Sequence, residues 1–66
     1  MISKITAARK EVGLTQEELA IKSGVSRTII SGLESGRLET TTTGTLLKIA
    51  DALGKTVYDI FFADSV

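Results

Sequence analysis

The stretch that most constrains the fold of this chain runs from Gln16 to Gly36 and has the pattern of two short helices joined by a tight turn. Thr15 stands where an N-cap is expected, and Glu18, three residues later, completes a capping box. Gly24 ends the first helix, because glycine adopts a positive φ at little cost. Ser26 then caps the second helix, since its hydroxyl can accept a hydrogen bond from a free backbone N–H.

The apolar residues of this stretch complete the pattern of a helix-turn-helix. Leu19 and Ala20 give the first helix an apolar face, and the small Ala20 lets the second helix cross closely above it. Ile30 and Leu33 point inward from the second helix. In this motif the second helix enters the major groove of DNA. The alternative is an ordinary αα-hairpin within a helical bundle. The helix bounds that the pattern predicts are residues 16–23 and 27–34.

The composition fits one small domain spanning residues 1–66. The chain has no cysteine and no histidine, so the usual metal ligands are missing and we expect neither a metal site nor another cofactor. Eight basic and eight acidic residues balance, which argues against a polybasic protein that binds nucleic acid regardless of sequence. Residues 1–37, which hold the motif, carry six cations and four anions, whereas residues 38–66 carry two and four.

A first helix is predicted from Ser3 to Val12, where apolar residues recur at helical spacing. Ile5, Ala8 and Val12 lie at positions i, i+3 and i+7 and are expected to form one buried stripe. Gly13 is expected to end this helix, again through a positive φ.

Four consecutive threonines, Thr40–Thr43, separate the motif from the next predicted helix. Because β-branched hydroxyl residues are poor in helix interiors and favourable at caps, Thr42 or Thr43 is expected to cap a fourth helix. The run is equally compatible with a solvated linker and with a loop that contacts phosphate. The fourth helix is predicted over residues 44–53, and Gly54 ends it. Its buried stripe is predicted to comprise Leu46, Ile49, Ala50 and Leu53.

A short fifth helix, capped by Thr56 and extending to Phe62, is almost entirely apolar or aromatic. Tyr58 and Phe62 lie four residues apart on one face, and exposed aromatic patches mark interfaces, so we expect this pair to form a homodimer interface. The alternative is that Phe62 folds back over the first helix and the patch disappears. The residues of this helix predicted to close the core are Val57, Ile60 and Phe61.

Four stretches carry a resemblance to a known family: R-K-E-V-G-L-T-Q-E-E-L-A, G-V-S-R-T-I-I-S, L-E-S-G-R and L-L-K-I-A-D-A-L-G. Through them the chain resembles, from Ile5 to Phe62, the phage-repressor type of helix-turn-helix domain, the Cro/cI or Xre-type family. The resemblance implies an all-α fold, a compact five-helix, lambda-repressor-like DNA-binding domain. It also implies a homodimer that binds half-sites in the major groove of double-stranded DNA, and no enzymatic activity.

Matching the family's motif position by position implies a set of contacts to DNA. Gln16 corresponds to a phosphate or base contact at the start of the first motif helix, and Arg37 to a backbone contact after the second. Arg9 and Glu34 correspond to a structural ion pair that ties the fold together. The positions that the resemblance implies for DNA binding are Gln16, Ser26, Arg27, Thr28, Ser31, Gly32 and Arg37.

Two features depart from the family's pattern. Gly32, which the resemblance places with Ser31 on an exposed turn, replaces the long polar or basic side chain that commonly reads a base there. A glycine at this point also costs up to ~1 kcal/mol of helix propensity. The loop after Arg37 lacks the usual proline and extra basic residues and offers Glu39 and threonines. The contact of this loop with the DNA backbone is therefore expected either to be weaker or to rely on hydroxyls and amides.

Arg27 is the residue best suited to read a base, because arginine can donate two hydrogen bonds to O6 and N7 of guanine. The alternatives are a plain phosphate contact and a solvated cation. Ile29 cannot face the core if Ile30 and Leu33 do. We expect it either to lie near a thymine methyl or to be partly buried.

Together these features predict a sequence-specific transcriptional regulator, most simply a repressor that occludes a promoter as a homodimer. The alternative is an antitoxin that binds a toxin and represses its own operon. An enzyme is disfavoured, because the chain lacks His, Cys and a phosphate-cradling glycine loop. Since the sequence shows neither a membrane-spanning stretch nor a signal peptide, we expect a cytoplasmic protein that is associated with the nucleoid when bound to DNA.

Overall fold

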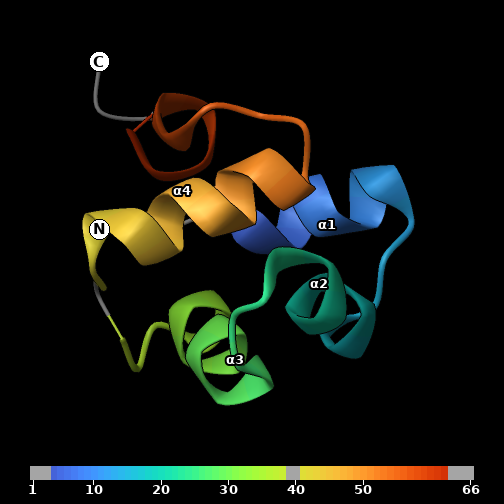
Figure 1. Cartoon of the computed structure of the whole chain (residues 1–66), viewed down its shortest axis with the longest axis horizontal. Coiled ribbons are helices and arrows are strands. Elements are labelled where there is room, and N and C mark those ends of the chain that lie inside the picture. Colours follow the sequence, from blue (N-terminus) through green and yellow to red (C-terminus); the bar gives the residue numbers. More distant parts are fainter. Residues whose placement is uncertain (1–3, 39–40, 63–66) are drawn as a thin grey trace.

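The computed structural model describes residues 4–38 and 41–62, with side chains for all of them except Phe62 (Figure 1). Within these residues all regular structure is helical, which confirms the predicted all-α class. Figure 1 shows α4 crossing the middle of the molecule, with α2 and α3 on one side and the C-terminal helix on the other. The elements are α1 (Ile5–Val12), α2 (Gln16–Ser23), α3 (Arg27–Ser35), α4 (Thr43–Ala52) and the π-helix η1 (Tyr58–Phe62).

The two motif helices begin and end where the capping rules place them. Thr15 Oγ1 accepts a hydrogen bond from Glu18 N at 3.0 Å, and Glu18 Oε1 accepts one from Thr15 N at 2.9 Å, so the capping box is confirmed. Gly24 ends α2 with a φ of 73°. Ser26 Oγ accepts a hydrogen bond from the backbone N–H three residues on, at 3.2 Å. The second helix extends one residue beyond the prediction, to Ser35.

The first helix differs from the predicted Ser3–Val12. Ser3 lies outside the described residues, and α1 begins at Ile5. Ile5 and Ala8 are buried as predicted, but Val12 is 42% exposed, so its place in the buried stripe was wrong. Val12 is the last residue of α1, and the glycine turn after it brings Leu14 against the core instead.

The fourth helix is capped by Thr42, the first of the two threonines considered. Thr42 Oγ1 accepts a hydrogen bond from Thr45 N at 3.2 Å, and α4 begins at Thr43. The helix ends at Ala52, one residue earlier than predicted, and Gly54 follows with a φ of 68°. Thr40 lies outside the described residues.

The C-terminal helix is a π-helix rather than the α-helix that the spacing suggested. Thr56 and Asp59 cap it reciprocally: Thr56 N donates to Asp59 Oδ2 at 3.2 Å, and Asp59 N donates to Thr56 Oγ1 at 3.1 Å. These hydrogen bonds, with the backbone one contributing most, lower the pKa of Asp59. Ile60 and Phe61 are both buried, as predicted, and Tyr58 is 54% exposed.

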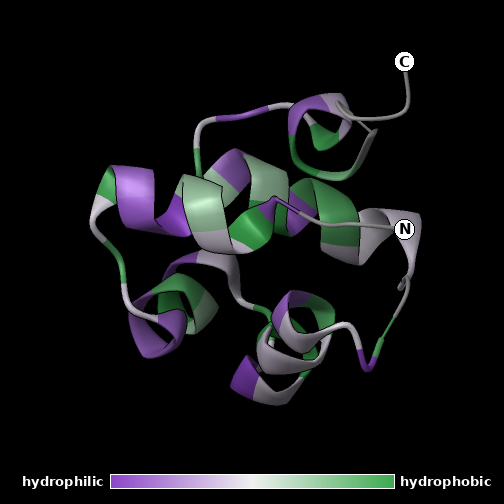
Figure 2. Cartoon of the chain, turned by 180° about the vertical axis from the view of Figure 1, so that it is seen from behind, coloured by the Kyte–Doolittle hydropathy of each residue, from purple (hydrophilic) through white to green (hydrophobic). Residues whose placement is uncertain are grey.

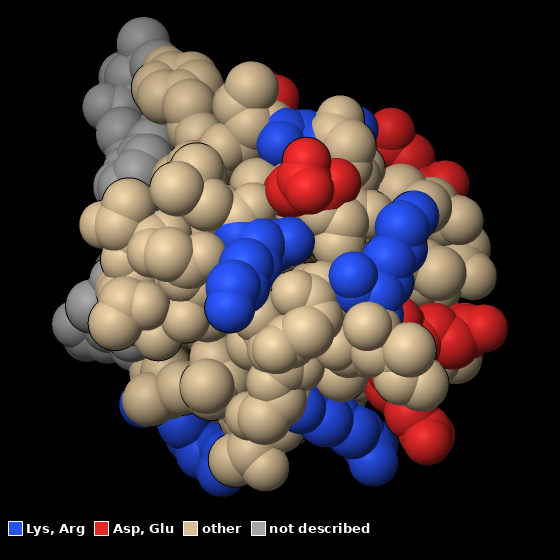
Figure 3. Space-filling view, viewed as in Figure 1, with Lys and Arg blue, Asp and Glu red and all other residues tan. Residues whose placement is uncertain are grey.

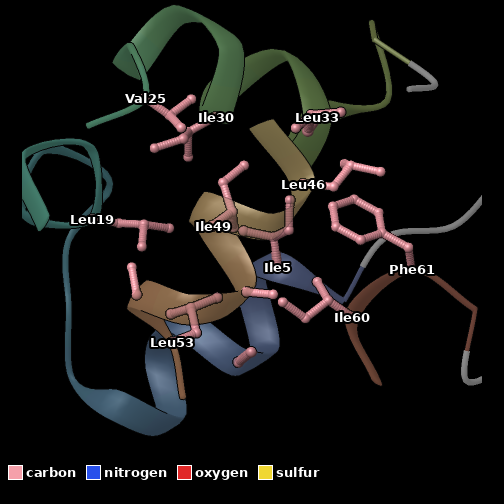
Figure 4. Close-up of a cluster of buried hydrophobic side chains, with 13 residues drawn as sticks. Ile5, Leu19, Val25, Ile30, Leu33, Leu46, Ile49, Leu53, Ile60 and Phe61 are labelled. Atoms are coloured by element: carbon pink, nitrogen blue, oxygen red, sulfur yellow. The ribbon is translucent and has the colours of Figure 1, made fainter. Parts of the chain in front are cut away.

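The core draws one fully buried side chain from each of the five helices. These are Ile5, Leu19, Ile30, Ile49 and Ile60, each less than 2% exposed. Figure 4 shows them converging with Ile49 of α4 near the centre. Burying a side chain of this size contributes about 1.5–3 kcal/mol. Figure 2 shows the hydrophobic residues concentrated where the helices meet. None of the described helices has the length and apolarity to cross a membrane.

Candidate functional site

Three polar side chains of α3 and one from the residues that follow it surround one hollow. Arg27 and Thr28, in the first turn of α3, are exposed, and Ser31, one turn later, is half-buried. Arg37, just beyond the end of α3, is exposed as well. Together these four residues line a surface hollow of about 340 Å³. Two guanidinium groups and two hydroxyls around a recess suit a ligand that is negatively charged and rich in hydrogen-bond acceptors.

The first turn of α3 adds backbone donors to the same side. The first N–H groups of any helix have no partner within the helix, and the helix dipole favours an anion at this end. The Ser26 oxygen already accepts a hydrogen bond from Ile29 N, which leaves the hydroxyl proton to donate elsewhere. Ile29 itself is half-buried and packs against the core, so of the two expectations for this residue partial burial is the correct one.

A second hollow, of about 480 Å³, lies at the start of α2 and adjoins the first through Arg27, which lines both. Gln16 and Lys10 also line it. Because Arg27 borders both hollows, the start of α2 and the outward side of α3 share one stretch of surface. We call this stretch the α3 surface. It comprises Gln16, Ser26, Arg27, Thr28, Ser31 and Arg37.

Gly32 is not part of the α3 surface, and the expectation that it lies on an exposed turn was wrong. Gly32 is buried, because Leu38 folds back over α3 at this point. A Cβ atom added at Gly32 would lie 2.9 Å from both Cδ1 and Cγ of Leu38. The glycine therefore permits a close approach of the following chain and offers no group to a ligand.

The positive charge of the α3 surface is modest. Its exposed cations are Arg27 and Arg37, with Lys10 beside the second hollow, where Glu17 also lies. Figure 3 shows Lys and Arg side chains spread over this face among uncharged and acidic residues, and at the lower edge, where α2 and α3 lie in Figure 1, uncharged surface separates them. This distribution suits a few placed contacts to phosphate better than a broad electrostatic attraction.

Arg9 and Glu34 form the pair that the resemblance implies, and its geometry is forked. Arg9 Nε lies 2.9 Å from Glu34 Oε2, and Arg9 Nη2 donates to Glu34 Oε1 at 3.0 Å. Arg9 Nη1 also donates to the carbonyl oxygen of Leu14 at 2.8 Å. The two side chains are only 12% and 6% exposed. Two parallel hydrogen bonds from a guanidinium give such a pair geometric specificity as well as energy.

Two further side chains converge on the same carboxylate. Thr6 Oγ1 donates to Glu34 Oε1 at 2.8 Å, and Gln16 Nε2 donates to it at 3.2 Å. Glu34 therefore joins α1, α2 and α3, and we call these four side chains, including Arg9, the Glu34 network. The network holds the side-chain amide of Gln16 beside α3. The second N–H and the carbonyl oxygen of that amide remain able to bind a ligand.

The environment of Glu34 favours its ionised form. Burial acts to raise the pKa of this carboxyl, but the hydrogen bonds from Arg9, Thr6 and Gln16 outweigh it, and the pKa is lowered. The hydrogen bond to Glu34 correspondingly raises the pKa of Arg9. The pair is therefore fully charged at neutral pH and acts as a fixed brace between the helices.

Sequence reasoning missed three residues that shape this site. Thr6 gave no signal, because its contact with Glu34 spans 28 positions. Ser35 accepts a hydrogen bond from Arg37 Nε at 3.3 Å and one from Arg37 N at 3.4 Å, so it restrains the arginine. A serine directly before a helix-ending glycine is a weak local signal for such a turn. The third residue is Leu38, which covers Gly32.

Of the two aromatic residues of the predicted interface on η1, the structure describes the side chain of Tyr58. Tyr58 is exposed, as expected of a residue at an interface between two copies. The side chain of Phe62 lies outside the described residues, so the predicted pairing of the two aromatics remains a prediction.

A protein-family model described as "Helix-turn-helix" matches residues 5–60 of the chain. A protein of Methanothermobacter thermautotrophicus, described as an uncharacterized HTH-type transcriptional regulator, is 46% identical over 65 residues, 97% of this chain and 93% of that protein. The uncharacterized HTH-type transcriptional regulator y4dJ of Sinorhizobium fredii is 46% identical over 52 residues, 79% of this chain and 66% of that protein.

Solved structures share the fold. The restriction-modification controller protein C.AhdI from Aeromonas hydrophila has a TM-score of 0.78 and 32% identity over 85% of this chain and 83% of that one. The SinR protein, solved in complex with the SinI protein, has a TM-score of 0.88 and 29% identity over 98% of this chain and 63% of that one. These similarities confirm the predicted helix-turn-helix fold.

Proposed function

Because the chain belongs to the helix-turn-helix family of the Xre and Cro/cI type, we propose that it is a repressor that binds operator half-sites in DNA as a homodimer. Its relatives carry the description of transcriptional regulators, and the family is one of DNA-binding proteins rather than enzymes. The observation that supports the proposal most strongly is the α3 surface. It places polar side chains and free helix amides on one outward side of the second motif helix.

In this proposal α3 lies in the major groove and Arg27 reads the base. Arg27 is exposed in the first turn of α3, the part of a recognition helix that meets base edges. Its two parallel N–H donors match O6 and N7 of guanine. Thr28 and Ser31, beside it in the hollow, offer short hydroxyls to neighbouring groups. Gln16 and Arg37 flank α3 and would hold phosphates on either side, which fixes the register of the helix without reading sequence.

A homodimer follows from the small size of this reading surface. One recognition helix contacts only a few base pairs, which is too little to single out one site in a genome. A two-fold dimer doubles the contact and sets the half-sites about 34 Å apart, one turn of B-DNA. The exposed Tyr58 supports η1 as the surface where two copies meet.

The test compares Arg27→Ala with wild type on two duplexes, one selected for tight binding and one of random sequence. Loss of a bidentate base contact is expected to cost about 1–3 kcal/mol on the selected duplex and much less on the random one. Lys48→Ala, an exposed lysine on α4 outside the α3 surface, is the matched control and is expected to bind both duplexes nearly as wild type does. An equal loss on the two duplexes would make Arg27 a phosphate contact.

A second candidate function, binding of a partner protein as an antitoxin does, is favoured by one observation. The similar SinR structure is that of a complex between two different proteins. Affinity purification of this chain from its native cells, followed by mass spectrometry, tests it. Recovery of a stoichiometric partner that is toxic when produced alone would support the antitoxin function, whereas recovery of the chain alone would favour the repressor.

A further inference from the structure

The chain that leaves α3 folds back onto the helix, and Leu38 contacts it at Gly32. Leu38 N donates a hydrogen bond to the carbonyl oxygen of Gly32 at 3.0 Å. The Leu38 side chain lies so close to Gly32 that an added Cβ would be 2.9 Å from two of its carbons. Ordinary Cβ contacts are wider than this. Gly32 has an ordinary helical backbone. Glycine is therefore needed at this position for the close approach of Leu38 and not for a positive φ.

Arg37 lies between two fixed points of this fold-back. Gly36, with a φ of 85°, reverses the chain on one side of Arg37, and Leu38 anchors it on the other. Ser35 accepts hydrogen bonds from both the backbone N and the Nε of Arg37. Arg27, Thr28 and Ser31 of α3 line the hollow on one side, and Arg37, from the chain after α3, lines it on the other.

Leu38 is a poor candidate for a purely stabilising role. It is 39% exposed and does not belong to the buried core cluster or to the partly buried residues packed against it. A core leucine of this domain, such as Leu19, is 0% exposed. The described contact of Leu38 is with α3, directly beside the hollow that Arg37 helps to line.

We propose that Leu38, seated on Gly32, is a positioning residue that holds Arg37 in place for a contact with a DNA phosphate. The proposal rests on the proposed DNA-binding function and assigns to Gly32 and Leu38 a role without DNA contact of their own. An arginine on a mobile loop must lose conformational freedom when it binds, which weakens the contact. The Gly32–Leu38 contact removes that cost in advance, so the single cation of this loop anchors the backbone effectively.

The test is a double-mutant cycle between Leu38→Ala and Arg37→Ala, measured as affinity for the selected duplex and for a random one. Each single variant is expected to weaken binding of both duplexes roughly three- to tenfold and to lower the slope of log K against log salt by about one phosphate per subunit. The double variant is expected to bind no worse than Arg37→Ala, because Leu38 acts only through the arginine. The control is Leu47→Ala, which truncates the same type of side chain, an exposed leucine, but on α4; it should leave the affinity for DNA unchanged.

A measurement without DNA separates this proposal from the proposed function. The backbone order parameter of Arg37, from ¹⁵N relaxation, is expected near 0.85 in wild type and below about 0.6 in both Leu38→Ala and Gly32→Ala. Gly32→Ala favours the helix but pushes Leu38 away, so it breaks the contact in a chain that remains folded. Additive losses in the cycle, or an Arg37 equally rigid in all three proteins, would overturn the proposal. Failure of wild type to bind any selected duplex would instead overturn the DNA-binding function.

Discussion

Replacing Glu34 by Gln tests the Glu34 network, because the change keeps the shape of the side chain and removes its charge. Arg9 would then keep its hydrogen bond to the Leu14 carbonyl but lose its counter-charge in a site where the two side chains are 12% and 6% exposed. Removing one partner of a fully buried ion pair costs about 3–5 kcal/mol, and leaving a charged donor without its acceptor costs somewhat less. For this partly buried pair we expect a loss of about 2–4 kcal/mol in the free energy of unfolding.

The chain offers a matched control in the ion pair between Lys55 and Glu11. Its N–O distance of 3.0 Å is nearly the same, but its side chains are 29% and 68% exposed. Exposed pairs contribute about 0–1 kcal/mol, so Glu11→Gln is expected to have little effect. Another change in the network, Thr6→Val, removes one hydrogen bond to the charged carboxylate of Glu34 and is expected to cost about 1.5–3 kcal/mol.

Thermal and urea unfolding followed by circular dichroism measure these differences. For a domain of this size 1 kcal/mol corresponds to roughly 4–8 °C in the melting temperature, so Glu34→Gln should melt at least ~8 °C below wild type while Glu11→Gln melts within a few degrees. Equal losses for Glu34→Gln and Glu11→Gln would refute the reasoning, since burial is what distinguishes the two pairs.

The same variant has a pH signature with a defined sign. The pKa of Glu34 is lower in the folded state than its ordinary value of 4.5, so the stability that its charge contributes is fully present above that value. That contribution is lost as the pH falls through the lowered pKa. Wild type should therefore lose more stability than Glu34→Gln between neutral and strongly acidic pH. Parallel pH profiles for the two proteins would contradict the lowered pKa.

Three further predictions concern DNA binding, assembly and backbone geometry. The slope of log K against log salt should correspond to about four to eight phosphates per dimer, at −0.9 each, and a slope near zero or far steeper in titrations from low to high salt would contradict it. Phe62→Asp should give a folded monomer, by sedimentation equilibrium and circular dichroism, whose binding to DNA is weakened. The control Ile21→Asp, at a 78% exposed position on α2, should stay dimeric, and a dimeric Phe62→Asp would place the interface elsewhere. Gly24→Ala, at a φ of 73°, should lower the free energy of unfolding in urea by about 1–2 kcal/mol. Gly44→Ala, in open space on α4, should raise it by about 0.5–1 kcal/mol, and equal effects would contradict the role of the left-handed turn.

The helix ends and the core were predictable because both follow local rules. Side chains that can accept hydrogen bonds from the free amides at a helix start identify two caps in the sequence, the Thr15–Glu18 capping box and Ser26. The structure has both caps. The stripe from Leu46 to Leu53 follows from helical spacing alone, and it is buried as predicted. Val12 keeps the helical spacing of its stripe, but it is the last residue of α1 and is 42% exposed, so spacing alone did not predict its burial correctly.

The parts that could not be predicted depend on contacts between distant residues or on the chain outside regular helices. The resemblance to the family implies an exposed turn for Gly32 together with Ser31, and no local pattern in the sequence contradicts it. Only the fold-back of Leu38 buries this glycine. In the same way, the hydrogen bond from Thr6 to Glu34 joins α1 to the end of α3, and no local pattern marks it.

The central claim, that the α3 surface reads a DNA sequence as part of a two-fold dimer, is tested most directly by selecting tightly bound duplexes from a random pool and sequencing them. The account predicts enrichment of an inverted repeat whose half-sites are about one helical turn apart, with a conserved guanine in each half-site. Selection with Arg27→Ala should lose the preference for that guanine and keep the rest of the repeat. A pool that remains random after selection with the wild-type protein would contradict the account.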